Sequence, residues 1–125
     1  MPVRELRDRF HNVLKLFVMN LLEKIIAAYY YYKGQCGDGV VMFRYNEYYI
    51  ACFDDARRVS NALGIEVTEG RGLVVVQLPA DSILDYVDEL SIYGIKVTLV
   101  DYRNERGNYD IPDVAIINKE KTEDY

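Results

Sequence analysis

The sequence predicts an α/β domain in which a mixed β-sheet is flanked by helices and preceded by a long N-terminal helix. Before residue 33, apolar residues recur every three or four positions, and after residue 39 short β-branched and aromatic runs alternate with helical stretches. The chain has 125 residues and is 50% apolar, with only 8 Gly and 3 Pro, so most of it is expected to be ordered. We therefore expect one domain over residues 1–125, with its core at 39–102.

The first predicted element is a helix over residues 4–33 that ends at Gly34, a favoured helix C-terminal cap. Its apolar stripe includes Leu6, Phe10, Val13, Phe17, Leu21 and Ile25. The stripe is wider than one sheet face requires, so the helix is also a candidate surface for self-association or a protein partner. Glu23 and Lys24 interrupt the apolar stretch 16–32, which argues against a membrane span.

Five runs rich in β-branched and aromatic residues predict the strands of the sheet. They cover residues 40–45, 48–53, 65–68, 73–78 and 95–102. Asn46-Glu47 is a candidate two-residue turn between the first two strands, and residues 69–72 (EGRG) join the next two. Residues 113–118 (DVAIIN) predict one more strand at the sheet edge, within a C-terminal extension at 103–125.

Two helices are predicted between these strands. The first begins at the aspartate pair 54–55 and ends at Gly64, because aspartate is a favoured N-cap and glycine suits the residue that follows a helix. The second begins at Asp81 or Ser82 and ends at Gly94 for the same reasons. Strands that alternate with helices in this way predict helices packed on a sheet.

Charge is distributed unevenly around a net value of −5. Residues 1–33 carry six Lys or Arg against three Asp or Glu, whereas residues 39–102 carry five against ten. Binding to a phosphate backbone depends on clustered cations. The acidic core therefore argues against tight autonomous binding of nucleic acid.

The chain offers little that could support catalysis. Its single histidine, His11, has no Cys or Asp partners at metal-ligand spacing, and Ser60 and Ser82 have no identifiable histidine partner. The glycines form neither a phosphate loop nor a dinucleotide fingerprint. We expect no enzymatic activity, no catalytic residues, no metal and no cofactor.

The N-terminus predicts a cytoplasmic location. Residues 4–9 are mostly charged, and no short apolar core with a small-residue cleavage site follows them. Without such a signal, Cys36 and Cys52 are expected to remain reduced.

The order of the core elements resembles the N-terminal mismatch-recognition domain of the MutS family of DNA mismatch repair proteins. FRYNEYYIACFDDARRVSNALGIEV, VVVQLP and DYVDELSIYGIKVTLVDY follow that family's F-R-M-G-D-F-Y-E-x-F, D-D-A-x-x-A-x-x-L-x-I, G-V-P-Y-H and G-x-K-V-A-I-x-E-Q segments. The matching residues are Phe43, Arg44, Tyr49, Asp54, Asp55, Ala56, Leu63, Ile65, Pro79, Tyr86, Leu90, Gly94, Lys96 and Val97. The resemblance covers residues 39–102 and implies a MutS domain I-like fold.

The resemblance also implies a DNA-binding role. In that family a Phe inserts between bases at a mispair from the minor groove, and a Glu two residues later hydrogen-bonds a mispaired base. Here the Phe position falls on Tyr48, the Glu position on Ile50, and the preceding Gly-Asp on Asn46-Glu47. An aromatic wedge unstacks a base step most cheaply where pairing is already poor.

Two function classes follow. The first is a mismatched-DNA-binding module that contacts a duplex through Tyr48, with support from Arg44, Arg57 and Arg58. The second is a protein-interaction or structural module that kept the fold and lost DNA recognition, favoured by the acidic core and by Ile50. The 125 residues hold no Walker motif and no room for clamp, connector or ATPase domains, so we expect a free-standing domain.

Overall fold

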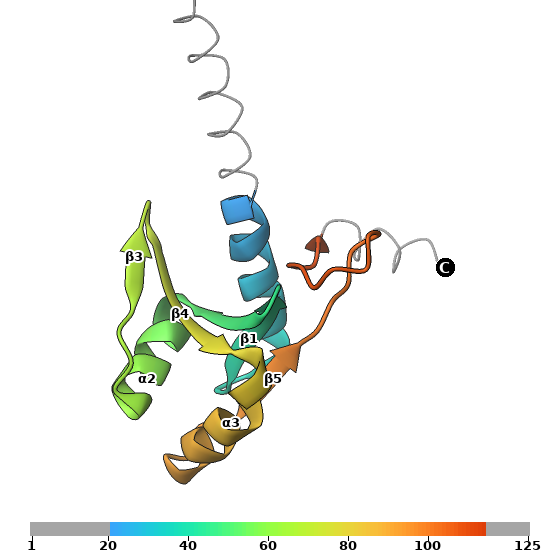
Figure 1. Cartoon of the computed structure of the whole chain (residues 1–125). Coiled ribbons are helices and arrows are strands. Elements are labelled where there is room, and N and C mark those ends of the chain that lie inside the picture. The colour runs from blue at the N-terminus through green and yellow to red at the C-terminus, as the bar shows by residue number, and fades with distance from the viewer. Residues whose placement is uncertain (1–20, 115–125) are drawn as a thin grey trace, which may run out of the picture.

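The computed structural model describes residues 21–114, in which a five-stranded sheet lies between two helical layers (Figure 1). The described part of the N-terminal helix covers residues 21–36. It is followed by β1 (Val40–Tyr45), β2 (Tyr48–Cys52), α2 (Phe53–Leu63), β3 (Thr68–Gly70), β4 (Leu73–Pro79), the 3-10 turn η1 (Ala80–Ser82), α3 (Ile83–Ile92) and β5 (Val97–Val100). The sheet order is β3-β4-β2-β1-β5, with β1 and β5 parallel and the other neighbours antiparallel. The predicted mixed sheet flanked by helices is confirmed.

The β1–β2 hairpin has the predicted turn, and β1 has the predicted bounds, whereas β2 ends at Cys52, one residue before the predicted end. Tyr45 pairs with Tyr48, and Asn46 adopts a φ of 54°, the left-handed conformation that a tight two-residue turn requires. Asparagine tolerates this conformation better than most residues. The hairpin therefore projects one turn, Asn46-Glu47, from one end of the sheet.

Alternation along the strands divides the interior into two cores, one on each face of the sheet. Core one lies under α2 and α3 and contains Val40, Met42, Tyr49, Ala51, Ala56, Val59, Val74, Val76, Leu78, Ile83 and Leu90. Core two lies under the N-terminal helix and contains Ile25, Ala28, Tyr29, Val41, Phe43, Ile50, Cys52, Ile111 and Val114. In Figure 1 the N-terminal helix, in blue, lies across the sheet from α2 and α3.

The N-terminal helix continues past Gly34 to residue 36, so the predicted end at Gly34 is wrong. A glycine inside a helix costs only about 1 kcal/mol relative to alanine, and local packing overrides that cost. Lys33, one residue earlier, donates hydrogen bonds from Nζ to Gly39 O and Asp55 Oδ1, which holds this last turn against the sheet. Gly37, with a φ of 64°, takes the left-handed position instead.

The start of α2 also differs from the prediction. β2 ends at Cys52, and Phe53, with a φ of 57°, already belongs to α2. The N-cap position is Cys52 and has no side-chain capping bond, so Asp54 and Asp55 lie inside the first turn instead of before it. This shift turns the Asp55 carboxylate into the interior, where it accepts a hydrogen bond from the Val41 backbone N–H at 3.0 Å.

The strands near the other edge are shifted as well. β3 covers Thr68–Gly70 instead of 65–68, because Arg71 and Gly72, with φ values of 52° and 80°, make a two-residue turn and free Glu69 and Gly70 to pair with β4. The strand predicted at 113–118 is not present at its first two positions. Residue 114 lies in core two, and residues 115–118 lie outside the described residues.

Several other predictions concern residues that the structure does not describe, including helix residues 4–20 and His11. Within residues 21–114, no helix is long and apolar enough to cross a membrane. Gly64 ends α2 in the left-handed conformation with a φ of 69°, as predicted. α3 begins at Ile83, after η1, and ends two residues before Gly94.

Candidate nucleic-acid interface

Tyr48 lies at the first position of β2, where the β1–β2 turn enters the sheet. Its side chain is 47% exposed, whereas its neighbour Tyr49 is buried in core one. Tyr48 is paired with Tyr45 on one side and with Pro79 on the other, so its backbone is fixed between two strands. The Ala80 N–H donates to the Glu47 carbonyl oxygen at 2.9 Å and secures the turn to the segment that precedes α3. The result is an exposed aromatic ring on a rigid hairpin end.

Arg44 lies on the other face of the hairpin from Tyr48. Its Nε donates to the Asn46 carbonyl oxygen at 3.0 Å, and its guanidinium carbon lies 4.0 Å from the centroid of the Tyr109 ring. The Tyr49 ring centroid is also 5.7 Å from this guanidinium. Arg44 therefore stacks on aromatic rings beside the turn, an arrangement that favours cation–π attraction.

A second arginine contacts the same Tyr109 ring. The Arg103 guanidinium carbon lies 4.1 Å from the ring centroid, and its two terminal nitrogens donate to Gly107 O at 2.8 Å and Tyr109 Oη at 2.7 Å. The Tyr109 carbonyl oxygen accepts the Asn46 N–H at 3.2 Å. We call Arg44, Tyr109 and Arg103 the arginine–tyrosine stack; it joins the turn to the segment after β5.

Tyr49, which lies near Arg44 of this stack, is held by Asp101. The Tyr49 hydroxyl donates to Asp101 Oδ1 at 2.6 Å. Burial, together with that carboxylate, raises the pKa of Tyr49 above its ordinary value. The hydroxyl thus remains a donor at neutral pH, and Tyr49 acts as a packing residue of the hairpin.

Ile50 lies in core two and is only 7% exposed. It points to the same face as Tyr48, because the two are separated by two strand positions. The N-terminal helix, however, covers Ile50 and leaves Tyr48 open. The structure therefore brings Tyr48, Asn46 and Arg44 to the surface around one turn and places Ile50 in the interior.

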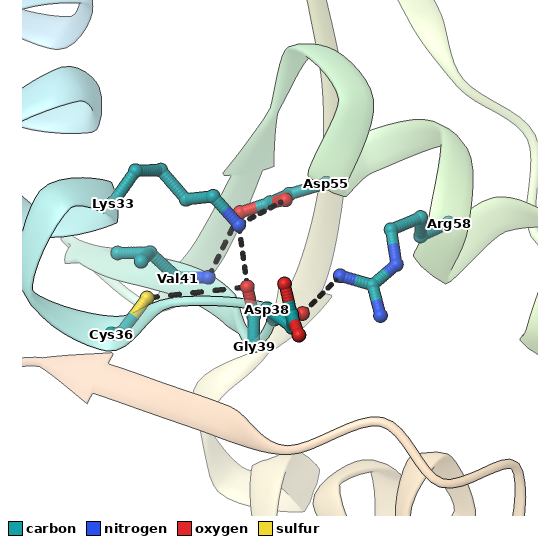
Figure 2. Close-up of polar contacts among 7 residues, drawn as sticks. All are labelled: Lys33, Cys36, Asp38, Gly39, Val41, Asp55 and Arg58. Carbon is teal, nitrogen blue, oxygen red and sulfur yellow. Dashed lines mark hydrogen bonds and ion pairs between the residues drawn. The ribbon is translucent and has the colours of Figure 1, made fainter.

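Arg57 and Arg58 lie away from this turn. Both belong to α2, which begins where β2 ends, about 13 Å along the strand from Tyr48 at the usual rise per residue. Arg57 forms an exposed ion pair with Glu69 at 3.4 Å. Arg58 Nη1 donates to the Asp38 carbonyl oxygen at 2.6 Å, near the start of β1 (Figure 2). These two arginines do not surround Tyr48.

The Arg58 end of the hairpin holds a separate polar depression. An open cavity of about 480 Å³ is lined by Tyr29, Lys33, Gly37, Asp38, Asp54, Asp55 and Arg58. Its cations are matched by acidic and carbonyl oxygens, as Figure 2 shows for Lys33 with Asp55 and Arg58 with Asp38. Among residues 21–114, no group of three or more His, Cys, Asp or Glu side chains is placed to hold a metal ion.

The sequence reasoning missed Tyr109 and Arg103, which lie in the predicted C-terminal extension. A signal is present in the segment RNERGNY at 103–109, where arginines and an aromatic residue flank the turn-forming residues Asn and Gly. The segment begins 55 residues after Tyr48 and carries no long-range pattern. Only the pairing of β5 beside β1 brings it to the β1–β2 turn.

Comparisons with known proteins agree with this architecture. The family model described as MutS domain I matches residues 23–119. The DNA mismatch repair protein MutS of Chlamydia trachomatis serovar L2b (strain UCH-1/proctitis) is 32% identical over 80 residues, which cover 64% of this chain and 10% of that protein. The same-named protein of Chlamydia pneumoniae is 33% identical over 73 residues, 58% of this chain and 9% of its own length.

A relative from another organism gives a similar result. The DNA mismatch repair protein MutS of Thermotoga neapolitana (strain ATCC 49049 / DSM 4359 / NBRC 107923 / NS-E) is 30% identical over 81 residues, 65% of this chain and 10% of that protein. The chain thus spans about a tenth of the length of the relatives it matches. Since the family model covers well over half of the sequence and the sheet has the expected mixed arrangement, the chain belongs to the MutS domain I family.

Proposed function

We propose that this chain binds duplex DNA at mispaired or distorted sites, with Tyr48 as an aromatic wedge at the β1–β2 turn. The observation that carries the proposal is the 47% exposure of Tyr48, at the position where the sequence resemblance implies the family's inserted Phe. An exposed ring on a rigid hairpin can enter the minor groove and replace part of the stacking lost at a kinked step. Membership of the MutS domain I family and the names of its relatives support the same role.

Ile50 predicts a change in how the site discriminates between lesions. In the family pattern this position carries a Glu that hydrogen-bonds a base, but Ile50 has no polar group and lies in core two. Selectivity would then come from the cost of unstacking the DNA, which varies with sequence and pairing. We expect affinity to follow the flexibility of the lesion more than the identity of its bases.

The first experiment is fluorescence anisotropy with two labelled duplexes, one fully paired and one with a single unpaired base. The wild type is expected to prefer the second duplex. Tyr48→Ala should weaken binding to it by about 1–3 kcal/mol, the scale of one stacked base, while Tyr48→Phe should retain binding because the ring remains. Equal binding by wild type and Tyr48→Ala would contradict the wedge.

Tyr93→Ala is the matched control. Tyr93 is also an exposed tyrosine, at 60%, but it follows the C-terminal end of α3. The β1–β2 turn lies near the N-terminal end of α3, where it contacts η1. Ten helical residues separate the two ends by about 15 Å. Removing this ring should leave both duplex affinities unchanged, which separates a wedge effect from a general loss of tyrosine surface.

The second candidate function is a protein-interaction or structural module. The specific observation in its favour is Ile50, an apolar residue buried in core two at the position where the resemblance implies the family's base-contacting Glu. This candidate would replace the first if wild-type protein bound neither duplex at low salt. Sedimentation would then test self-association or partner binding by the N-terminal helix, whose predicted apolar stripe extends beyond the described residues.

A further inference from the structure

We propose that the segment 103–109 forms a second DNA-contacting element and that Arg106 binds a backbone phosphate beside the β1–β2 turn. The inference rests on the proposed function, since it concerns the same duplex. The acidic core contributes little electrostatic attraction to the phosphate backbone. Phosphate binding therefore depends on individual unpaired cations near Tyr48. Among residues 21–114 there is one such cation, and it lies on a segment fixed to the turn.

The segment is attached to the β1–β2 hairpin. Asn46 in the turn donates its N–H to Tyr109 O at 3.2 Å, and Asp110 N–H donates to Tyr102 O at 3.0 Å. Arg103 and Tyr109 form an antiparallel bridge, and the arginine–tyrosine stack adds side-chain contacts from β1. The segment is therefore built into the same end of the sheet as Tyr48.

The segment is also held rigid by hydrogen bonds of its own. The Asn104 side-chain oxygen accepts the backbone N–H groups of Arg106 at 3.0 Å and Asn108 at 3.1 Å. Gly107, with a φ of 81°, donates its N–H to Asn104 O at 2.9 Å and closes the turn. These hydrogen bonds fix the backbone of the loop, so the exposed Arg106 side chain projects from a rigid segment.

Most Lys and Arg side chains in the described part of the chain already have interaction partners. Lys24, Lys33 and Arg57 form ion pairs, Arg58 binds a carbonyl oxygen, and Arg44 and Arg103 belong to the arginine–tyrosine stack. Among residues 21–114, the cations with neither an ion pair nor a side-chain hydrogen bond are Arg71, Lys96 and Arg106.

These three free cations lie in different parts of the fold. Lys96 precedes β5 beside the start of β1, because its carbonyl oxygen accepts the Val40 N–H, so it lies at the opposite end of the hairpin from Tyr48. Arg71 lies in the β3–β4 turn, beyond the Cys52 end of β2. Arg106 is thus the free cation at the Tyr48 end of the described chain, and a guanidinium suits a phosphate.

The test measures the salt dependence of DNA affinity. Arg106→Gln should weaken binding to paired and lesion-containing duplexes alike, roughly five- to tenfold at about 0.1 M salt. It should also reduce the slope of log affinity against log salt concentration by about one, as expected for one lost phosphate contact. Arg106→Lys keeps the charge and should retain the slope.

Arg71→Gln is the matched control, because Arg71 is another unpaired arginine in a tight turn but lies away from Tyr48. It should retain the wild-type slope. The inference is overturned alone if the wild type binds and Tyr48→Ala loses lesion preference, but Arg106→Gln behaves as Arg71→Gln does. Absence of wild-type binding at every salt concentration would overturn the proposed function and, with it, this inference.

Discussion

Asp55 is a single side chain on which three segments of the chain converge. It is 1% exposed, and its two oxygens accept the Val41 N–H at 3.0 Å and the Lys33 ammonium at 3.1 Å. Lys33 also donates to Gly39 O at 2.5 Å, so the N-terminal helix, the start of β1 and α2 meet at this carboxylate (Figure 2). A buried carboxylate is tolerated because both of its oxygens have donors.

Asp55→Ala is therefore expected to destabilise the fold by about 3 kcal/mol, because it leaves the buried Val41 N–H without an acceptor and the Lys33 ammonium without its carboxylate partner. Asp54→Ala is the control: Asp54 is the adjacent, exposed aspartate in the same helical turn, and its loss should cost about 0.5 kcal/mol or less. Urea unfolding measures both variants. Equal midpoints for the two would show that the Asp55 contacts contribute no net stability.

For single residues, the sequence indicates burial better than it indicates which contacts a side chain makes. Tyr49 packs in core one, on the opposite face of β2 from Tyr48, as the alternation of strand side chains requires. The aspartate pair was predicted to cap α2, but the left-handed Phe53 starts the helix earlier and carries Asp55 inward. A bulky residue with a positive φ is rare, so no propensity rule predicts that shift.

Among the elements, the β1–β2 turn is where local sequence and proposed function meet. Asn46, with a φ of 54°, shapes the turn, accepts the Arg44 hydrogen bond on its carbonyl oxygen and donates its N–H to Tyr109. Any residue can supply these backbone groups, but few adopt the left-handed conformation without strain. The Asn46 side chain therefore matters mainly through the conformation that it permits.

Asn46→Val should destabilise the protein by roughly 1–2 kcal/mol, because a β-branched residue is strained at positive φ. Asn46→Gly should lie within about 1 kcal/mol of wild type, because glycine adopts this conformation freely but loses more chain entropy on folding. Thermal unfolding of the two variants tests the difference. If valine is tolerated as well as glycine, the turn does not depend on the left-handed conformation.

The elements that the sequence predicted best are those with strong local signals. β1 has the predicted bounds, and the glycine end of α2 is confirmed. β3 was displaced because EGRG was read as one turn, whereas Arg71 and Gly72 alone make it. Arginine at positive φ gives no turn signal, so the strand pairing, not the local composition, fixes this hairpin.

For the whole molecule, the two cores differ in how they are closed. Core one is closed by α2 and α3, which lie between strands in the chain. Core two is closed by the N-terminal helix and by Ile111 and Val114, which come from opposite ends of the described chain. The resemblance covered residues 39–102, whereas the family match at 23–119 includes both contributors. Sequence patterns inside the sheet could not predict this closure, because it joins segments far apart.

The segment after residue 102 is thus proposed to be part of the folding unit, which Ile111→Ala tests. Ile111 is fully buried in core two, so its truncation should lower the free energy of unfolding by about 2–5 kcal/mol. Ile92→Ala removes the same atoms from a side chain that is 80% exposed, and it should cost about 0.5 kcal/mol or less.

Urea unfolding of both isoleucine variants, with the m-value as a check on cooperativity, compares them directly. A large loss at Ile111 alone would mean that the last segment and the sheet unfold together. The arginine–tyrosine stack would then be anchored from both sides, by β1 and by the core-two residue two positions after Tyr109. Similar small losses for Ile111→Ala and Ile92→Ala would instead separate the segment from the fold and leave the β1–β2 turn without the rigid neighbour that phosphate binding by Arg106 requires.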